Sequence, residues 1–343
     1  MFWIIGGGKM GISHLALITP YLGKSMVVLV EPKRSVRLLL SYFGYRSFSN
    51  VQKALRKAGK PKGVIIATPT ASHAALIEWA ISNNIPFFVE KPLTLDAERS
   101  QILCKSAAEK GVPAQVGFVM RYVPSFQKVR SLIADGQLGA VKSYRASMSG
   151  NVISKPPKRS SWQGDFVRGG GCLNEYGPHI IDLTRFIFGE IDSVSKAAKG
   201  HVHCVDADDW IELEWHHLSG VAGALEIDWC DATKRKSTIQ FEIIFDSATV
   251  RVDNSALEII SPNGADLNMA SRCELDQPSR PPNVGYYLRG EEFSLELEDF
   301  LGTCLGTSVH VDSNLPRDVT PKLEDGYAVD RLIDEIARKA GLK

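Results

Sequence analysis

The chain has 343 residues, with 40 Lys and Arg against 39 Asp and Glu, and 44% of its residues are hydrophobic. A single hydrophobic core stops growing at about 250 to 300 residues, so this length predicts two domains. The near balance of charge lacks the basic excess of nucleic-acid binders, and no apolar run reaches the roughly 18 residues of a membrane span. We therefore expect neither nucleic acid nor a membrane as a partner.

Six cysteines are spread along the chain without a C-x-x-C pair, which favours reduced, mostly buried thiols. The first residues enter an apolar stretch and glycines at once, with no basic segment, long apolar segment and cleavage site in succession. Nothing in this pattern marks the chain for export, so we expect a cytoplasmic protein.

Residues 1–120 alternate short apolar runs with longer helical stretches, as is typical of a parallel sheet wrapped by helices. Helices are predicted over Ala71–Asn83 and Leu95–Lys110, which end at Asn and Gly stops. The predicted strands are Phe2–Ile5, Met26–Val30, Gly63–Ala67, Pro86–Val89 and Pro113–Gly117. We expect a doubly wound α/β domain with a parallel sheet here.

Residues 121–343 follow a different pattern, which predicts an α+β domain. A helix is expected over Ser125–Ala134, and an amphipathic helix over Leu323–Lys343 closes the chain. Asp209–His216 and Val221–Trp229 alternate apolar and polar residues, which predicts a large, mostly antiparallel open sheet with one half-polar face. Such a face meets water or another subunit, and we expect a homodimer or homotetramer through this open sheet.

A glycine-rich turn follows the first predicted strand. The segment Gly6-Gly7-Gly8-Lys9-Met10-Gly11 fits G-x-G-x-x-G at the mouth of a helix. In this pattern Gly6 permits a tight turn, Gly8 lets the backbone approach a pyrophosphate, and Gly11 lets helix and strand pack closely. The free N–H groups of the helix N-terminus favour phosphates. A simple glycine turn is the alternative interpretation.

A carboxylate at the end of the second strand strengthens the nucleotide interpretation. Glu31 stands 20 residues after Gly11, where a carboxylate accepts hydrogen bonds from both ribose hydroxyls. It would also repel a 2'-phosphate, while Lys33 and Arg34 would attract one. We expect NAD as the cofactor, with NADP less favoured.

An ionisable pair follows the strand at Pro86–Val89. Glu90 and Lys91 would lie at the carboxyl edge of the parallel sheet, where open α/β folds bind their ligands. Pro92 restricts the backbone at Lys91, through either a cis or a trans bond. The alternative is a strand end with a solvated lysine, stopped by proline.

A candidate general base lies at a predicted helix start. Pro178 suits a first helical turn, which places His179 near the positive end of the helix dipole. That position disfavours imidazolium and keeps the ring able to accept a proton. Asp182 would orient this ring or cap a neighbouring loop. A zinc site of Glu175 and His179 lacks a third ligand at a recognisable spacing, so we expect no metal.

Several motifs in fixed order resemble the Gfo/Idh/MocA oxidoreductase family, which includes glucose-fructose oxidoreductase and inositol dehydrogenase. They are the glycine motif, Ala67-Thr68-Pro69-Thr70-x-x-His73, Glu90-Lys91-Pro92, Val116-Gly117-Phe118-x-x-Arg121-Tyr122, Gly136-x-Leu138-Gly139, Gly169-Gly170-Gly171, His179-x-x-Asp182 and Glu324-Asp325-Gly326. The resemblance implies a Rossmann domain, a second domain with a large open sheet, NAD(P), and redox chemistry at a sugar or cyclic polyol carbon.

The resemblance also assigns roles to single residues. Lys91 would lie near the nicotinamide ribose and the substrate hydroxyl, and Glu175 and His179 match the family's D-x-x-x-H pair with Glu in place of Asp. Because a misplacement of about 1 Å can cost on the order of 100-fold in rate, this departure indicates a different substrate or a lesser role for the carboxylate. The expected catalytic residues are therefore Lys91, His179 and Glu175.

The remaining expected site residues fall into two groups. Besides the glycine motif with Lys9 and Met10, cofactor binding is expected of Glu31, Arg34, Thr68, Pro69, His73, Glu90 and Lys91. Substrate binding is expected of Arg121, Tyr122, Trp162, Asn174 and Glu175. For Thr68, Pro69 and His73 a structural helix-start turn is an equal alternative, as is an interdomain ion pair for Arg121.

Three functions follow from these patterns. The first is hydride transfer between nicotinamide and a carbinol carbon of a sugar, sugar derivative or cyclitol. The second is a redox-neutral elimination or hydrolysis that uses bound nucleotide transiently. The third is a non-catalytic nucleotide-binding protein, which the presence of Lys91 and His179 disfavours and the Glu at position 175 favours.

Overall fold

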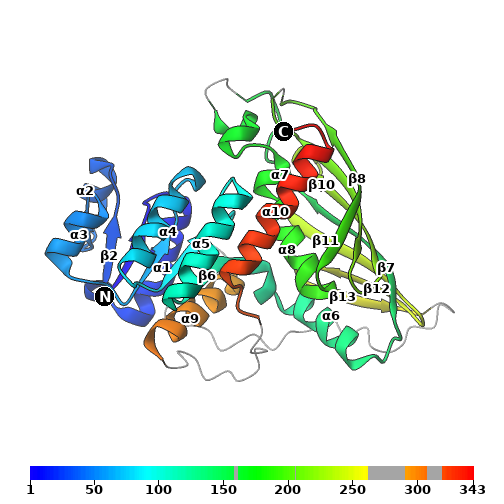
Figure 1. Cartoon of the computed structure of the whole chain (residues 1–343), viewed down its shortest axis with the longest axis horizontal. Helices are drawn as coiled ribbons and strands as arrows, with labels where there is room; N and C mark the ends of the chain where they lie inside the picture. Colours follow the sequence, from blue (N-terminus) through cyan, green and yellow to red (C-terminus); the bar gives the residue numbers. More distant parts are fainter. Residues whose placement is uncertain (158–160, 205, 262–289, 307–318) are drawn as a thin grey trace. The chain divides into compact units, whose positions relative to one another are not determined.

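The computed structural model describes residues 1–157, 161–204, 206–261, 290–306 and 319–343. The chain divides into two compact units, described separately below (Figure 1). The first comprises Met1–Val119 and the described part of Pro278–Ala328, and the second comprises Met120–Gln277, with its described residues, and Val329–Lys343.

A six-stranded parallel sheet forms the centre of the first unit. Its order, β3-β2-β1-β4-β5-β6, is that of dinucleotide-binding folds. The strands are β1 (Phe2–Ile5), β2 (Val27–Val30), β3 (Arg46–Phe48), β4 (Gly63–Ile66), β5 (Phe87–Glu90) and β6 (Ala114–Gly117). The predicted parallel sheet is thus confirmed, and the added edge strand β3 is too short and too polar to stand out in the sequence.

Helices cover both faces of this sheet and complete its core. They are α1 (Lys9–Leu22), α2 (Arg34–Tyr42), α3 (Val51–Ala58), α4 (His73–Ser82), α5 (Ala97–Lys110) and α9 (Glu291–Leu305), with short 3-10 turns at Lys24–Met26 and Thr70–Ser72. Leu297, Phe300 and Leu301 of α9 enter the core formed by β1, β2 and α1. Helix α9 therefore belongs to the first unit, although its sequence position lies within the predicted second domain.

A seven-stranded sheet forms the second unit, in the order β13-β12-β11-β7-β10-β9-β8. Its strands are β7 (Val141–Ser149), β8 (Ile191–Gly200), β9 (Trp210–His217), β10 (Ala222–Asp228), β11 (Thr238–Phe245), β12 (Thr249–Asp253) and β13 (Leu257–Ile260). Only β7 and β10 pair in parallel, and all other neighbours are antiparallel. The expected mostly antiparallel open sheet is confirmed.

Helices lie on one face of this second sheet (Figure 1). They are α6 (Pro124–Asp135), α7 (Cys172–Glu175), α8 (Gly177–Phe188) and the later turns of α10 (Leu323–Lys339), with 3-10 turns at Val119–Tyr122, Trp162–Gly164 and Phe166–Arg168. The ring of Phe188 stacks on that of Tyr144 with centroids 4.1 Å apart, which joins α8 to β7. No described helix covers the opposite face, whose side chains are largely polar.

A chain of hydrogen bonds runs through the inner face of this sheet. Trp215 Nε1 donates to the Tyr144 hydroxyl at 2.7 Å, and that hydroxyl lies 2.7 Å from His217 Nε2. The other ring nitrogen of His217 lies 2.7 Å from the carbonyl oxygen of Gly189, so it carries the proton and Nε2 accepts from Tyr144. A Cβ at Gly223 would lie 2.4 Å from Tyr144 Cζ, so only glycine leaves room for this ring.

Three further observations concern membrane spans, metal sites and cysteines. Among the described residues, no helix is both long enough and apolar enough to cross a membrane. Within the same residues, no three His, Cys, Asp or Glu side chains are grouped to hold a metal. Five of the six cysteines are free thiols, and Cys273 lies outside the described residues.

Candidate active site

The glycine loop between β1 and α1 has the geometry of a phosphate cradle. Gly6 has φ of +108°, and a Cβ there would lie 2.4 Å from the carbonyl oxygen of Ala67. A Cβ at Gly11 would lie 1.9 Å from the carbonyl oxygen of Gly6, so both positions exclude every other residue. At Gly8 a Cβ would meet nothing within 4 Å. The turn is therefore packed from behind and open at Gly8, next to the exposed Lys9 and the half-buried Met10 at the start of α1.

Glu31 is fixed against this loop at the end of β2. Its Oε2 accepts a hydrogen bond from the Gly7 backbone N–H and its Oε1 from that of Lys33, both at 2.7 Å. Arg37 donates to the carbonyl oxygens of Glu31 and Pro32, both at 2.6 Å, a contact that the sequence did not reveal. Each carboxylate oxygen retains a lone pair for a ribose hydroxyl.

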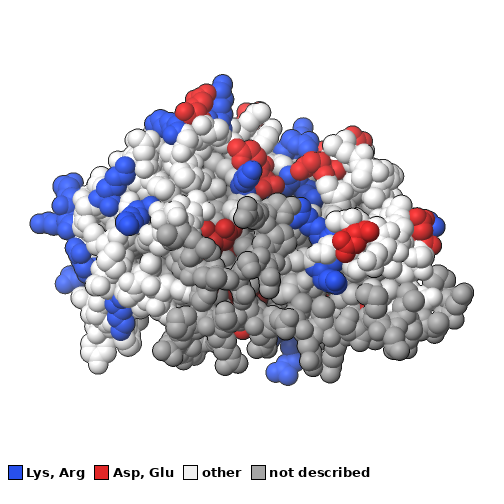
Figure 2. All heavy atoms as spheres, turned by 90° about the horizontal axis from the view of Figure 1, so that it is seen from below, with Lys and Arg blue, Asp and Glu red and all other residues white. Residues whose placement is uncertain are grey.

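Basic side chains gather on the part of the first unit around α2 and α3. Residues 32–77 contain nine Lys and Arg and no Asp or Glu, and Figure 2 shows blue without red at the corresponding left-hand end. In the described part of the chain, none of these nine forms an ion pair. The exposed Lys33 and Arg34 belong to this basic surface. The buried carboxylate of Glu31 therefore lies next to a positively charged surface.

The segment that carries Lys91 is tied to α1. Glu90 ends β5, and its Oε1 lies 2.6 Å from Nε2 of His14, whose side chain is fully buried. Burial raises the pKa of the Glu90 carboxyl, but the hydrogen bond from His14 and the electrostatic effects of His14, Lys91 and His73 outweigh it and lower the pKa. The Lys91–Pro92 bond is cis. The contact of His14 with Glu90 could not be predicted from the sequence, because a single histidine in an amphipathic helix does not indicate its partner.

His73 ties the same segment to the loop after β4. Its Nδ1 lies 3.0 Å from the Pro92 carbonyl oxygen, and its Nε2 lies 3.0 Å from that of Thr68. Burial lowers the pKa of His73, although both carbonyls oppose this shift. The neutral ring carries one proton and donates to one of these two carbonyls, so His73 contributes to the site through its place between the loops after β4 and β5. Thr68 itself lies beside the glycine loop, since a Cβ at Gly6 would lie 3.1 Å from its Cγ2.

The second unit presents Glu175 and His179 four residues apart, where α7 passes into α8. Both are half-buried, and Pro178 lies in the first turn of α8 as predicted, with Tyr176 as the N-cap. Asn174 is buried and donates to the carbonyl oxygens of Phe166 and Gly170, so it shapes the loop before α7. Trp162, in contrast, is 44% exposed.

A buried carboxylate anchors α7. Asp208 Oδ2 accepts from the Leu173 backbone N–H at 2.7 Å and from Cys172 Sγ at 2.9 Å. Gly171 has φ of +89°, and a Cβ there would lie 2.2 Å from Asp208 Oδ1. Burial and the adjacent Asp208 raise the pKa of the Cys172 thiol well above its usual range, so Cys172 stays protonated. It is a packing and hydrogen-bonding group rather than a metal ligand or nucleophile.

Arg121 and Asp182 form a buried pair inside the second unit. Arg121 Nε and Nη2 donate to the two carboxylate oxygens of Asp182 at 2.8 and 2.6 Å, and the guanidinium lies over the Phe186 ring. Arg121 is 5% exposed and Tyr122 1%, and the contacts of Arg121 with Asp182 and Phe186 support α8. Asp182 accordingly pairs with Arg121, and its roles as a partner of His179 or as a loop cap stay predictions.

Two sequence models of one family match the two parts of this chain. The model described as an oxidoreductase family with an NAD-binding Rossmann fold matches residues 1–118, and the GFO/IDH/MocA C-terminal domain matches residues 126–251. The chain belongs to the Gfo/Idh/MocA oxidoreductase family. The resemblance drawn from the order of its motifs is thereby confirmed.

Members of the family resemble this chain over its whole length. An inositol 2-dehydrogenase of Rhizobium meliloti (strain 1021) is 29% identical over 351 residues, which cover 100% of this chain and 97% of that protein. A scyllo-inositol 2-dehydrogenase (NAD(+)) of Bacillus subtilis (strain 168) is 30% identical over 196 residues, or 56% of this chain and 55% of that protein. The structure of levoglucosan dehydrogenase in complex with NADH shares the fold, with a TM-score of 0.77 at 22% identity over 99% of this chain and 96% of that chain.

The first unit fits the dinucleotide that the family binds. Gly8 leaves open space where the backbone must approach a pyrophosphate, and the N-terminus of α1 follows it. Glu31 stands at the end of β2 with acceptor capacity in reserve. The chain is therefore an NAD-binding oxidoreductase of this family.

Proposed function

We propose that this protein is an NAD-dependent dehydrogenase that oxidises or reduces a carbinol carbon of a cyclitol, sugar or sugar derivative. The observation that carries this proposal is the fixed Glu31 carboxylate beside the open Gly8 turn, together with Lys91 and His179 at the ends of their own elements. Similarity over 97% of an inositol 2-dehydrogenase supports the substrate class.

In this proposal three side chains divide the chemistry. NAD, when bound, supplies the nicotinamide that accepts or returns a hydride. His179 takes the proton of the substrate hydroxyl, because the N-terminal position on α8 favours a neutral ring. Lys91 binds the same oxygen and stabilises its developing negative charge. Glu175, one methylene longer than the Asp of the family motif, orients the neighbouring hydroxyls.

NAD rather than NADP is the proposed cofactor. A buried carboxylate held by two backbone N–H groups keeps its negative charge in place, so a 2'-phosphate near Glu31 would be repelled. Lys33 and Arg34 are exposed and offer the opposing attraction. This proposal also includes cofactor binding by Arg34, Thr68 and Pro69. It assigns cofactor binding to residues 1–120, and substrate binding and oligomerisation to residues 121–343.

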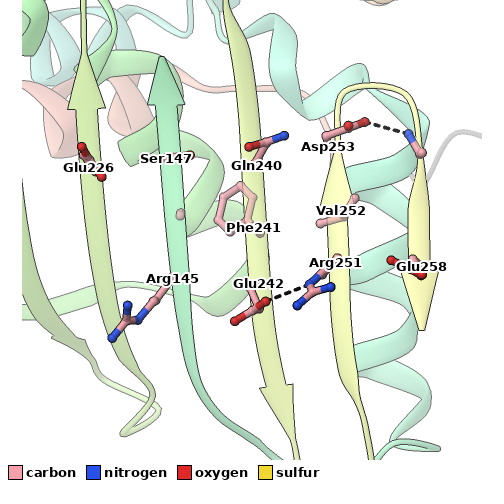
Figure 3. A pocket seen from close by; sticks show the side chains of 12 residues that line it. Arg145, Ser147, Glu226, Gln240, Phe241, Glu242, Arg251, Val252, Asp253 and Glu258 are labelled. Atoms are coloured by element: carbon pink, nitrogen blue, oxygen red, sulfur yellow. Dashed lines mark hydrogen bonds and ion pairs between the residues drawn. The ribbon is translucent and has the colours of Figure 1, made fainter. Parts of the chain in front are cut away.

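A homodimer or homotetramer through the open face of the second sheet is also proposed. One row of side chains on this face alternates in charge across the strands (Figure 3). From β13 to β8 the row consists of Glu258, Arg251, Glu242, Arg145, Ala224, Glu214 and Lys196. Arg251 Nε lies 2.8 Å from Glu242 Oε2 within the row. When a second copy meets the row in reverse, Glu258 faces Lys196 and Arg251 faces Glu214, while Arg145 faces its own copy at the centre. The four opposite-charge contacts of the two outer pairs support association of two identical faces.

The proposal also includes a cytoplasmic location and the homo-oligomer through the second sheet. The free described thiols support a reducing compartment such as the cytoplasm. Light scattering on the protein and on an Arg251→Glu, Lys196→Glu double variant, which turns both kinds of opposite-charge contact into like-charge contacts, tests the assembly, with Lys105→Glu on the first unit as the control. We expect an oligomer that only the double variant dissociates, and an unsubstituted monomer would contradict the assignment.

The function is tested with a panel of inositols, aldoses, uronic acids and nucleotide-sugars, each with NAD and followed by NADH absorbance and by product analysis. We expect NADH to form with a cyclitol or sugar. Conversion of a substrate without net NADH would instead support the redox-neutral lyase or hydrolase. Binding of NAD without conversion of any compound would support the non-catalytic nucleotide-binding protein.

A further inference from the structure

We propose that two buried histidines, His14 and His73, hold the residues on either side of Lys91 and thereby fix the direction of its ammonium group. In this arrangement Glu90 is a positioning residue rather than a cofactor ligand. The inference rests on the proposed function of Lys91, and all of its contacts lie within the first unit.

The first contact fixes the residue before Lys91. His14 Nε2 lies 2.6 Å from Glu90 Oε1, and the His14 ring packs edge-on against Phe88 with centroids 5.5 Å apart. A Cβ at Gly117 would lie 3.3 Å from the other Glu90 oxygen, so glycine on β6 leaves just enough space for the carboxylate. The Glu90 side chain is thus confined between α1, β5 and β6.

The second contact fixes the residue after Lys91. His73, the first residue of α4, lies with one ring nitrogen 3.0 Å from the Pro92 carbonyl oxygen and the other 3.0 Å from that of Thr68. The loops after β4 and β5 are therefore joined through one ring. Lys91, which is half-buried, stands between two anchored neighbours while its own side chain reaches solvent.

The charge state of Glu90 follows from the same geometry. Nδ1 of His14 is buried and has no hydrogen-bonding partner among the described residues, so a proton there would be costly and the ring carries its proton on Nε2. That N–H donates to an ionised Glu90. The charged or titratable groups that act on Glu90 are His14 from α1, His73 from α4 and the adjacent Lys91. The ionised carboxylate and the Lys91 ammonium group thus interact, and Lys91 is one of the causes that lower the pKa of Glu90.

Histidine at both positions is better explained by positioning than by core packing alone. Both rings are almost completely buried, at 0% and 1% exposure, where an apolar side chain of similar size would avoid the cost of burying polar atoms. Each ring instead places a nitrogen within hydrogen-bonding distance of a residue next to Lys91. We call the two histidine contacts on either side of Lys91 the bracket. Since a displacement of about 1 Å can cost on the order of 100-fold in rate, the bracket determines how well Lys91 acts.

The test compares His14→Leu, His73→Leu and Glu90→Gln with Lys91→Met, using the best substrate of the panel. We expect each of the first three to lower kcat by about 10- to 100-fold with little change in NAD affinity. In Glu90→Gln, but not in His14→Leu, the alkaline limb of the pH–rate profile should move to lower pH, because only Glu90→Gln removes the negative charge beside Lys91. His14→Gln, whose amide can still donate to Glu90, should recover much of the rate.

A buried histidine elsewhere provides the matched control. His217 is 2% exposed, and both of its ring nitrogens are hydrogen-bonded in the second unit. His217→Leu should lower stability and leave the pH–rate profile of the folded enzyme in place. Movement of the profile in this variant as well would overturn the bracket, because any buried histidine would then act alike.

A second readout needs no substrate. Acetylation of Lys91 by acetic anhydride, followed against pH by peptide mass spectrometry, should become appreciable at lower pH in Glu90→Gln than in the unsubstituted protein. An unchanged acetylation profile in folded Glu90→Gln would overturn the bracket. If Lys91→Met retains full turnover, it is the proposed function of Lys91 that fails, and the acetylation result still decides whether the bracket exists.

Discussion

The carboxylate of Glu31 lies 2.7 Å from the backbone nitrogen of Gly7, so the residue that would meet the ribose is held by the same loop that would meet the phosphates. Glu31→Gln keeps one acceptor for this contact and removes the negative charge. We expect the ratio of NAD affinity to NADP affinity to fall at least about tenfold, or about 1.4 kcal/mol, because a 2'-phosphate is no longer repelled. Fluorescence titration with both cofactors measures this ratio. An unchanged ratio, with Glu109→Ala as the surface control, would remove Glu31 from cofactor selection.

His179 is predicted to carry the proton transfer. His179→Ala should lower kcat by about 10² to 10⁴, the usual contribution of a general base, while NAD affinity stays within twofold. The control is His216→Ala, since His216 is exposed on β9 of the same unit. Steady-state rates and cofactor titrations on both variants decide the matter, and a fully active His179→Ala would end the assignment.

How much of this could be predicted from the sequence depends on the separation of the residues involved. The glycine turn, Glu31 and Pro178 were predictable because the chemistry and its spacing lie within one βαβ unit or one helical turn. His14 with Glu90 and Asp208 with Leu173 were not, because 76 and 35 residues separate the partners and neither member is unusual in its own segment. Similarly, α9 joins the first core from a distant part of the chain, which hydrophobic pattern alone cannot assign.

The buried pair of Arg121 and Asp182 is predicted to matter for stability. Asp182→Ala leaves a guanidinium at 5% exposure without its carboxylate, so unfolding free energy should fall by about 3 to 5 kcal/mol. The double variant Arg121→Met, Asp182→Leu should recover part of this loss, since the guanidinium of Arg121 is then removed and the neighbouring Arg185 keeps its ion pair with Glu190. Urea denaturation measures both. The exposed Lys105–Glu109 pair, with 3.9 Å between its atoms, should contribute less than about 1 kcal/mol.

Two buried histidines predict loss of stability in acid. Burial is the main cause that lowers the pKa of both His73 and His217 below the ordinary value near 6.5. The folded state therefore binds fewer protons than the unfolded state in this range, and its stability rises with pH. The contribution is complete above about pH 6.5 and is lost as pH falls through the folded pKa values.

The measurement is urea denaturation at a series of pH values below neutrality. The slope of unfolding free energy against pH should be smaller in His217→Gln than in the unsubstituted protein, because one proton uptake is removed. Equal slopes in the two proteins would mean that His217 does not contribute. The buried carboxyls Asp208 and Asp228, whose pKa values are raised by burial, are common to both proteins and cancel in this comparison.

The missing side chain at Gly223 has an effect on how the second sheet reaches a single arrangement. The hydrogen bonds among Trp215, Tyr144 and His217 are all satisfied only when β7, β9 and β10 meet in one alignment. Sliding β7 by one position would turn Tyr144 outward and drive Arg145 into the hydrocarbon interior. The space left by Gly223 on β10 thus accepts the phenol ring of Tyr144 on β7 only in the native alignment. Other alignments of the strands place a different side chain opposite this space, which disfavours mispaired sheets.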